Sequence, residues 1–296
     1  MAIKLAVIPV AGRGTRLIPL TKSLPKEMLP VGRKPVVQYV VEELSRSGLE
    51  RLLFVTGATK TAIENYFDLD VELIDHLRKT GKEDLLEELA FEKADLQYFY
   101  TRQRRQLGLG HAILCAESFI GNEPFVVALG DTILGVPSKA NIVRRMIEQF
   151  ELKKADAVIA FEEVPESEVH RYGIAAPVSL RDPEVFRLAR IVEKPNVAEA
   201  PSCLAVASRY VFRPSIFGYL RDTKPGKNNE IQLTDAIQAM IADGKKVYGV
   251  RVLPEEHRFD IGNFGSYFDA FLEFALADPD HGEEVRRKME SLLNKG

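Results

Sequence analysis

The sequence contains only two cysteines, Cys115 and Cys203, and each lies among apolar residues. Two isolated thiols do not provide the disulfide framework of a small secreted domain. We therefore expect both thiols to be reduced, in a cytoplasmic protein. The sequence also lacks any group of cysteines and histidines with the spacing of zinc ligands, which argues against a structural zinc site.

Long apolar runs and an excess of positive charge are lacking as well. No segment approaches the roughly 18 consecutive apolar residues of a membrane-spanning helix. The apolar N-terminal stretch contains Lys4 and runs into Pro9, which does not fit a signal peptide. Because 43 acidic residues outnumber 40 lysines and arginines, the formal net charge is −3. We expect neither a membrane nor a nucleic acid as partner, although this balance permits a local cationic site.

The first half of the chain alternates apolar runs with helical patterns. Its 296 residues, 46% of them hydrophobic, are enough for one large domain or two small ones. We expect strands at 4–10, 51–57, 95–101 and 124–131, and helices at 35–48, 60–67 and 110–119. Gly48 should end the first of these helices. Buried strands separated by helices are typical of an α/β fold with a mostly parallel sheet. The charged stretch 70–93 is expected to be a helical surface insertion.

The second half is more mixed. We expect strands at 156–164, 172–180, 188–195, 203–212 and 247–253, and helices at 230–246 and 264–278. We interpret the aromatic stripe of the last helix as core packing. A helical tail, with Val285, Met289 and Leu292 on one face, is expected to dock on its own domain or on a neighbouring subunit. The predicted organisation is one main domain at 1–278 and a C-terminal helical tail at 279–296.

A glycine turn follows the first expected strand. Gly12 and Gly14 lie between that strand and a helix that begins near Pro35. Glycine lets the backbone approach an anion closely, so such turns often bind phosphate. A dinucleotide fingerprint would have a third glycine and pass directly into the helix, and a P-loop would end in Gly-Lys-Ser/Thr. The turn matches neither pattern, which argues against an NAD-dependent dehydrogenase, and alone it is better explained as a structural turn.

Three cations, Arg16, Lys22 and Lys26, follow the glycine turn, and Pro19 and Pro25 lie between them. Proline fixes φ, so a proline-rich loop holds its cations in place. Fixed cations beside a glycine turn suit a polyphosphate whose charge increases during a reaction. The loop therefore favours nucleotide binding over a solvated charged segment.

Two aspartates are candidate metal ligands. Asp131 ends the expected strand 124–131, and Asp260 follows a polar turn. Ligands of open α/β sheets bind at the carboxyl ends of the strands, and Mg²⁺ takes oxygen ligands that include only one or two carboxylates. Either aspartate alone is better explained as a turn residue or a helix cap. Their combination with the cationic loop favours a Mg²⁺ site.

Several segments resemble the sugar-1-phosphate nucleotidyltransferases, and within them the bacterial UTP–glucose-1-phosphate uridylyltransferases, or UDP-glucose pyrophosphorylases. The resemblance runs in order from about Ala6 to Leu276, and its signature segments are AGRGTRLIPLTKSLPKEMLPV, RQRRQLGLGHAILCA, RYGIAAP, IVEKP, EAPSCLAVASRYVF, TKPGKNNEIQLTDAI and HRFDIGNFGSYFDAFLEFAL. The resemblance implies a Rossmann-like nucleotide half and a sugar half with β insertions. It implies a Mg²⁺-dependent reaction of UTP with glucose 1-phosphate that gives UDP-glucose and pyrophosphate. It also implies a homo-oligomer.

The resemblance also implies roles for individual residues. Arg16 and Lys26 would hold the triphosphate and the departing pyrophosphate as catalytic residues. The other roles, carried over motif by motif, are nucleotide binding by Ala11, Gly12, Gly14, Gln103 and Gly108, sugar-phosphate binding by Gly173, Glu193 and Lys194, and Mg²⁺ binding by Asp131 and Asp260. Gln103 would hydrogen-bond the uracil edge. His111 is interpreted as structural.

Some residues depart from the uridylyltransferase pattern. The segment Leu129-Gly130-Asp131 looks more like the thymidylyltransferase branch. Cys203 stands where an asparagine is expected, and Ser208 and Asn229 stand where glycines are expected. The alternatives are therefore the same reaction with dTTP, the use of another hexose 1-phosphate, and a non-catalytic paralogue that binds nucleotide. Uracil and thymine differ by one methyl group, which is worth only about 1–3 kcal/mol in a pocket.

Overall fold

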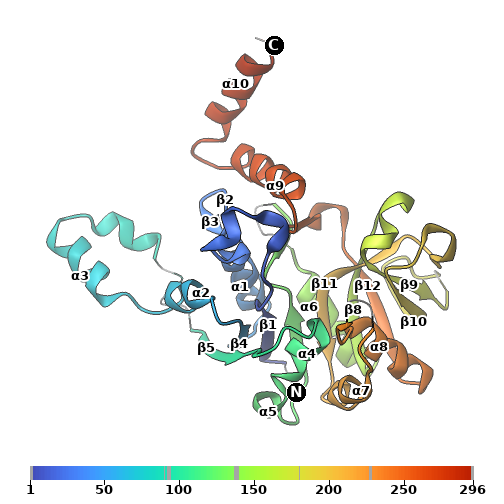
Figure 1. Cartoon of the computed structure of the whole chain (residues 1–296). Coiled ribbons are helices and arrows are strands. Elements are labelled where there is room, and N and C mark those ends of the chain that lie inside the picture. Colours follow the sequence, from blue (N-terminus) through green and yellow to red (C-terminus); the bar gives the residue numbers. More distant parts are fainter. Residues whose placement is uncertain are drawn as a thin grey trace.

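A nine-stranded mixed sheet forms the centre of the computed structural model, which describes residues 3–89, 91, 95–136, 140–179, 181–226 and 229–294 (Figure 1). The strand order is β5-β4-β1-β6-β11-β8-β12-β10-β9. The strand bounds are Leu5–Pro9 (β1), Arg51–Thr56 (β4), Gln97–Arg102 (β5), Phe125–Ala128 (β6), Ala157–Glu163 (β8), Gly173–Pro177 (β9), Val185–Glu193 (β10), Leu204–Phe212 (β11) and Val247–Arg251 (β12). The expected α/β fold is therefore present.

The four strands at one side of the sheet, β5, β4, β1 and β6, are parallel. Their apolar side chains enter two separate cores. Val7 and Leu53, which are register partners, lie in one core, while Ile8 and Phe54 lie in the other. A strand with a core on each face must be apolar at nearly every position. This is why the continuous apolar runs of the sequence identified these strands.

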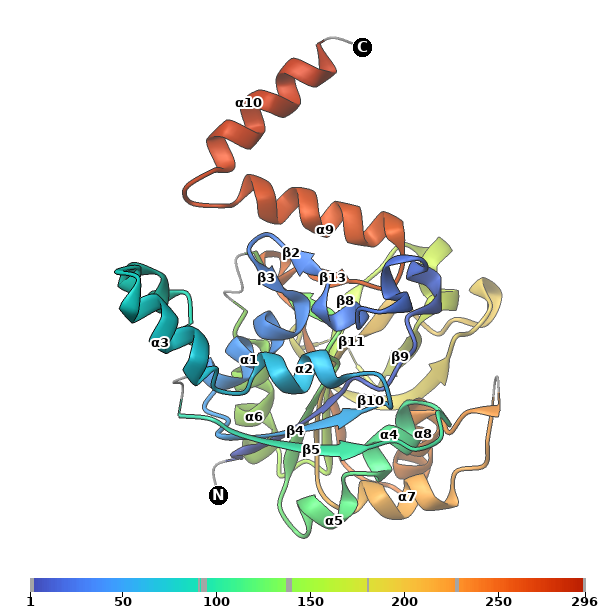
Figure 2. The ribbon, with the colours of Figure 1, turned by 60° about the vertical axis from the view of Figure 1, so that its left-hand side comes forward.

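Helices cover both faces of the sheet (Figure 2). The core that contains Ile8 is closed by α1 (Val36–Arg46), α2 (Thr61–Tyr66) and α6 (Ile142–Leu152). The core that contains Val7 is closed by α4 (Leu109–Leu114), α5 (Glu117–Ile120), α7 (Ile216–Asp222) and α8 (Leu233–Ala242). Gly48 ends the first helix as expected, with a φ of 89°. The single helix expected at 110–119 is instead the pair α4 and α5.

The second half of the sheet contains antiparallel strands. Strands β10 and β11 run against the other seven, so the sheet is mixed, with most strands pointing in one direction. Two short pairs flank the sheet, and they are β2 (Pro30–Val31) with β3 (Lys34–Pro35) and β7 (Thr132–Leu134) with β13 (Arg258–Asp260). Strand β7 follows shortly after β6 in the chain, and β13 pairs with β7. This pairing brings residues near 130 and near 260 together.

The C-terminal helices differ from the sequence expectation. Helix α9 (Phe264–Leu276) buries Ala270 and Phe274, but Phe268 and Phe271 are 56% and 41% exposed. The prediction that its aromatic stripe is core packing is therefore wrong for these two residues. Helix α10 (Gly282–Leu293) extends away from the sheet in both views, and only Gly282 is buried in it (Figures 1 and 2). The tail does not dock on its own domain.

The expected surface insertion is present as α3 (Val71–Lys79) and the short 3-10 segment Glu83–Glu87, which project from the sheet (Figure 1). The end of the predicted insertion, at 90 and 92–94, lies outside the described residues. Within the described ranges, no helix has the length and apolar character needed to cross a membrane.

Candidate active site

The cationic loop crosses the carboxyl edge of the parallel strands. It consists of three short 3-10 segments, Thr15–Leu17, Leu20–Lys22 and Lys26–Met28. Gly14 has a φ of 65°, and its carbonyl accepts a 2.8 Å hydrogen bond from the Thr21 hydroxyl. A positive φ at this turn favours glycine. Gly14 is not among the described residues that line a cavity at this edge, so the structure gives it a role in loop shape and no direct support for nucleotide contact.

Two adjoining cavities lie at this edge. The first, called the loop cavity, has a volume of about 310 Å³ and is lined by Ala11, Gly12, Lys26, Gln103, Gly108 and Asp131, among others. The second, called the β10 cavity, has a volume of about 390 Å³ and is lined by Arg16, Asp131, Gly173, Glu193, Lys194 and Asp260, among others. Asp131 lines both cavities. Except for Gly14, all the site residues predicted from the sequence therefore lie around one continuous region.

Lys26 and Asp131 form an ion pair between the loop and the end of β6. Burial alone would lower the pKa of Lys26, but the charges of Asp131 and Glu27 raise it above its ordinary value. Burial alone would raise the pKa of Asp131, but Lys26 lowers it. Each partner thus keeps the other ionised. Beneath this pair, Lys60 donates a 2.7 Å hydrogen bond to the fully buried Glu27.

Asp260 lies beside Asp131 because β13 pairs with β7. The Ile261 amide donates a 2.9 Å hydrogen bond to the Asp131 carbonyl, and Asp260 is the register partner of Thr132. Burial, followed by the charge of Asp131, raises the pKa of Asp260. Two carboxylates that oppose each other's ionisation in this way are stabilised by a cation between them. The described residues contain no cluster of three or more histidines, cysteines and acids. The pair therefore fits Mg²⁺, which completes its shell with water and phosphate oxygens, better than it fits zinc.

The base-side residues are fixed by hydrogen bonds around the loop cavity. The Gln103 side-chain nitrogen donates to the Gly108 carbonyl at 3.0 Å, and it lies 2.9 Å from His111 Nδ1. The Gln106 side-chain nitrogen donates a 2.7 Å hydrogen bond to the Ala11 carbonyl. Gly108 has a φ of 94°, and a Cβ there would come within 2.7 Å of the Glu230 side chain. Only glycine fits at this position.

The sugar-side residues lie at the ends of β9 and β10. The Lys194 ammonium is 3.3 Å from the Glu193 carboxylate, and the Lys194 amide donates a 2.9 Å hydrogen bond to the Tyr172 carbonyl. Lys194 has a φ of 45°, which is unusual for a residue with a side chain. A Cβ on Gly173 would lie 3.0 Å from the Thr234 hydroxyl oxygen. These contacts fix the backbone that forms this wall of the β10 cavity.

Sequence reasoning missed the buried support behind Asp131. Arg209 is fully buried, and it donates a 2.6 Å hydrogen bond to Glu43 and a 2.9 Å hydrogen bond to the Thr132 carbonyl. It thereby fixes the residue that follows Asp131. Breaking a buried ion pair of this kind typically costs about 3–5 kcal/mol. The available signal was an arginine in the middle of the apolar strand β11.

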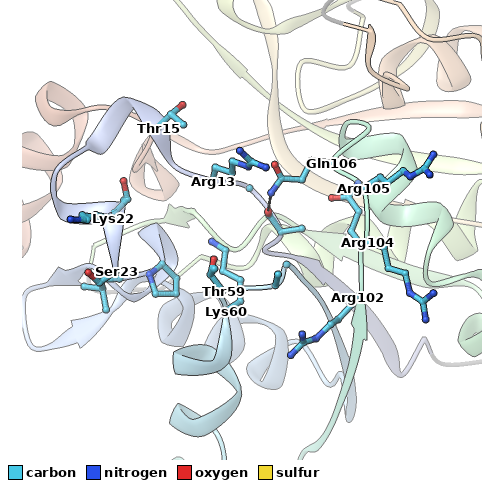
Figure 3. Close-up of a pocket in the computed structure, with 18 of the residues that line it drawn as sticks. Arg13, Thr15, Lys22, Ser23, Thr59, Lys60, Arg102, Arg104, Arg105 and Gln106 are labelled. Atoms are coloured by element: carbon cyan, nitrogen blue, oxygen red, sulfur yellow. Dashed lines mark hydrogen bonds between the residues drawn. The ribbon is translucent and has the colours of Figure 1, made fainter.

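A third cavity, called the cationic cavity (Figure 3), shares Ala11, Gly12 and Gln103 with the loop cavity, but Asp131 is not part of its lining. Its volume is about 940 Å³, and its lining contains six basic residues and no acidic ones: Arg13, Lys22, Lys60, Arg102, Arg104 and Arg105. In Figure 3, Arg104 and Arg105 extend from the segment after β5, on the side opposite to Lys22. Among the described residues, Lys60 and Arg102 have acidic partners, whereas Arg13, Lys22, Arg104 and Arg105 have none. Of these six, the sequence analysis singled out only Lys22.

Comparison with known proteins places this geometry in a family. The profile of the family described as "Nucleotidyl transferase" matches residues 5–276. The chain belongs to this family. A UTP–glucose-1-phosphate uridylyltransferase of Staphylococcus epidermidis is 44% identical over 290 residues, which are 98% of each chain.

Solved structures of nucleotidyl transferases agree with this assignment. One described as a UTP-bound UGPase from Acinetobacter baumannii is 40% identical, with a TM-score of 0.89 over 98% of this chain and 99% of its own. Another, described as a UDP-glucose pyrophosphorylase complexed with UDP-glucose, is 38% identical, with a TM-score of 0.82 over 92% of this chain and 98% of its own. The family match ends at Leu276, before α10, and the division into a domain at 1–278 and a tail remains a prediction.

Proposed function

We propose that this nucleotidyl transferase transfers the uridylyl group of UTP to glucose 1-phosphate and so produces UDP-glucose and pyrophosphate. The observation that carries the proposal is the position of Asp131. It lies where a cavity with the expected base-binding residues meets a cavity with the expected sugar-binding residues. The name of the similar Staphylococcus epidermidis protein contains both substrates, and the two similar solved structures are described as bound to UTP and to UDP-glucose.

In the proposed complex, the two reactants bind in the two cavities, on either side of the α-phosphate. The uridine lies in the loop cavity, against the backbone of Ala11 and Gly12 and beside Gln103. The sugar lies in the β10 cavity, with Glu193 accepting hydrogen bonds from its hydroxyl groups and Lys194 holding its phosphate. The attacking phosphate oxygen is already anionic, so the reaction needs no strong general base. Catalysis then consists mainly of alignment and of charge neutralisation.

The cations act on the polyphosphate. Lys26 is protonated and partly buried, and it is the nearest cation to Asp131. When UTP binds, the Lys26 ammonium exchanges part of its contact with Asp131 for contacts with phosphate oxygens. Arg16 extends from the same loop toward Asp260 and lines the β10 cavity. Its guanidinium can therefore stabilise charge that develops on the side of the α-phosphate that faces this cavity.

Asp131 and Asp260 would hold Mg²⁺, since two adjoining carboxylates at a phosphate site suit this ion. When bound, Mg²⁺ would neutralise phosphate charge during the transfer. Arg209 and the β7–β13 pairing keep the two carboxylates at this position.

The test is pyrophosphate release from the purified protein with Mg²⁺, glucose 1-phosphate and one of UTP, dTTP, CTP, ATP or GTP. We expect the highest kcat/KM with UTP. Turnover with the other nucleotides but not with UTP would contradict the proposed base. Binding of UTP without turnover of glucose 1-phosphate with any of these nucleotides would favour the non-catalytic paralogue or another hexose 1-phosphate.

Use of dTTP is the second candidate, and the segment Leu129-Gly130-Asp131 favours it. The structure gives Gly130 another explanation. A Cβ at this position would lie 2.5 Å from Val10, so the glycine permits close packing of two strand ends. Gly130 is also not among the described residues that line the loop cavity. We therefore prefer UTP, and the nucleotide comparison decides between the two.

We also propose that the chain forms a homo-oligomer through α9 and α10. Phe268, Phe271, Leu292 and Leu293 expose apolar side chains on these two helices, and α10 extends away from the rest of the chain (Figure 2). Exposed apolar groups in one region commonly mark an interface. The molar mass from light scattering should exceed that of one chain, and the double substitution F268S/F271S should lower it. A monomeric wild-type protein would contradict the proposal.

A cytoplasmic location remains a prediction, in keeping with the free thiols of Cys115 and Cys203.

A further inference from the structure

We propose that His111 is a positioning residue that selects the base, because it fixes the orientation of the Gln103 side-chain amide. This inference rests on the proposed function, in which Gln103 faces the uracil ring. It assigns His111 a role that differs from the purely structural one expected from the sequence.

The Gln103 amide is held from two directions. Its nitrogen donates to the Gly108 carbonyl at 3.0 Å and lies 2.9 Å from His111 Nδ1. The Gly108 carbonyl can only accept a hydrogen bond, so the nitrogen of the amide must face it. His111 Nδ1 faces the same nitrogen and must therefore also accept. Both hydrogens of the amide nitrogen are used in this way.

This arrangement requires one form of His111. Nδ1 accepts only in the neutral imidazole whose proton is on Nε2. Burial lowers the pKa of His111, which favours the neutral ring. The first turn of α4 fixes the backbone of His111, because the Ala112 amide donates to the Gly108 carbonyl at 3.2 Å and the Cys115 amide donates to the His111 carbonyl at 3.1 Å. Gly108 and His111 are thus two acceptors on one rigid element.

With its nitrogen turned toward α4, Gln103 presents its carbonyl oxygen as an acceptor. Gln103 is 6% exposed and lines the loop cavity, and no described residue donates a hydrogen bond to this oxygen. Uracil carries a hydrogen on N3, which can donate to an amide oxygen. Cytosine has an unprotonated N3 at the same place, which would meet the oxygen as acceptor against acceptor. The fixed amide therefore admits uracil and rejects cytosine.

Without His111, the amide is held by the Gly108 carbonyl alone. Turning it over would then cost one hydrogen bond rather than two. The turned amide offers its nitrogen to cytosine N3, so discrimination between UTP and CTP should fall. Thymine also has a hydrogen on N3, so discrimination between UTP and dTTP should not change.

The test compares His111→Phe with His111→Asn. Phenylalanine keeps a planar ring without an acceptor, whereas the Asn oxygen can take the place of Nδ1. We expect the ratio of kcat/KM for UTP to that for CTP to fall at least tenfold in His111→Phe and to stay near wild type in His111→Asn. With UTP as substrate, the His111→Phe substitution should change KM rather than kcat. Dissociation constants for the two nucleotides from calorimetry should show the same pattern. If His111→Phe does not fold, His111→Ala replaces it.

Three results would overturn the inference. The first is an unchanged UTP/CTP ratio in a folded His111→Phe variant. The second is an equal loss in His111→Phe and His111→Asn, which would indicate a packing role. The third is a wild-type protein that binds UTP and CTP equally well while it still forms UDP-glucose, which leaves the proposed function intact. A wild-type protein that binds no UTP would overturn the proposed function together with this inference.

Discussion

Lys26 stays protonated at a position where burial alone would lower its pKa. The carboxylates of Asp131 and Glu27 provide the compensation, and Glu27 is in turn neutralised by Lys60. The reacting centre thus contains a short row of alternating charges. UTP can enter this row as a further anion, with Lys26 already protonated and held. This arrangement avoids reorganisation of charge during the reaction.

The first prediction concerns this pair of residues. Lys26→Ala and Asp131→Asn should each lower kcat by about 10²–10³, because each removes a charge that acts on the phosphates. Pyrophosphate release measures the effect, and circular dichroism checks the fold. Lys34→Ala is the matched control, because Lys34 pairs with Glu42 and does not line the described cavities. Near-wild-type turnover in both site variants would mean that the site is assigned wrongly.

At the scale of elements, four helices of the described residues end in the same way. Gly48 after α1, Gly81 after α3, Lys154 after α6 and Gly244 after α8 all have positive φ, at 89°, 69°, 48° and 76°. In each case the residue after the turn residue donates a backbone hydrogen bond to the carbonyl five positions before itself, as Ala155 does to the Phe150 carbonyl at 3.0 Å. This left-handed turn is usually a glycine. Lys154 is the exception.

The second prediction follows from that exception. Lys154→Gly should raise the free energy of unfolding by about 1 kcal/mol, because glycine adopts the left-handed conformation without steric cost. Gly244→Ala, at the equivalent position of α8, should lower it by a similar amount. Urea denaturation measures both, and turnover should not change because neither residue lines the described cavities. A destabilised Lys154→Gly variant would contradict this account.

The third prediction concerns the junction of α9 and α10. Arg33, in the turn between β2 and β3, donates two hydrogen bonds to Asp278, at 2.8 and 3.0 Å. Asp278 also accepts from the His281 amide at 2.9 Å, just before α10 begins. Arg33→Ala should therefore speed hydrogen exchange throughout α10 and leave α6 unaffected. Arg286→Ala, on α10 itself, is the control. Equal exchange in both variants would show that Arg33 does not anchor the helix.

The same junction should depend on pH. The hydrogen bonds from Arg33 and from the backbone lower the pKa of Asp278 from 3.8 to about 2. A carboxylate whose pKa is lower in the folded state stabilises that state when it is ionised. Its contribution is therefore complete above about pH 4 and is lost as the pH falls toward 2. Pepsin, which is active in this range, should cut between α9 and α10 increasingly as the pH falls, and cleavage of Arg33→Ala should depend less on pH.

At the scale of the whole molecule, charge is unevenly distributed. The chain has a formal net charge of −3, yet the cationic cavity gathers six basic residues beside the nucleotide loop. A concave surface of one sign raises the local concentration of an oppositely charged substrate. UTP carries several negative charges, so this surface should speed its approach to the loop cavity. Salt screens such an effect over about 10 Å at 0.1 M.

The fourth prediction tests this attraction. The double substitution R104A/R105A should lower kcat/KM for UTP several-fold at low ionic strength and leave kcat unchanged. The difference from wild type should shrink in 0.5 M salt. The double substitution R286A/R287A, which removes the same charge from α10, should have little effect. A loss that persists at high salt would indicate direct contact with the nucleotide instead.

Features that depend on neighbours along the chain could be predicted from the amino-acid sequence. Continuous apolar runs identified the strands because a strand with a core on each face needs them. The glycine turn and the cations Arg16 and Lys26 indicated a phosphate site, and the role of Gln103 came only from the resemblance of its segment to the nucleotidyltransferases. Such motifs depend on residue type and on spacing along the chain, so they can be recognised without a fold. The family match and the cavity linings agree with them.

The tertiary structure alone decided what depends on residues far apart in the chain. The Lys26–Asp131 pair joins positions 105 residues apart, and the Arg209–Glu43 pair joins positions 166 residues apart. The same holds for the proximity of Asp131 and Asp260, which exists only because β13 pairs with β7. An amphipathic pattern likewise does not state which partner covers it, so the aromatic stripe of α9 could not be assigned from the sequence. Charge pairing and burial follow from the packing of distant segments, and that packing exists only in the folded chain.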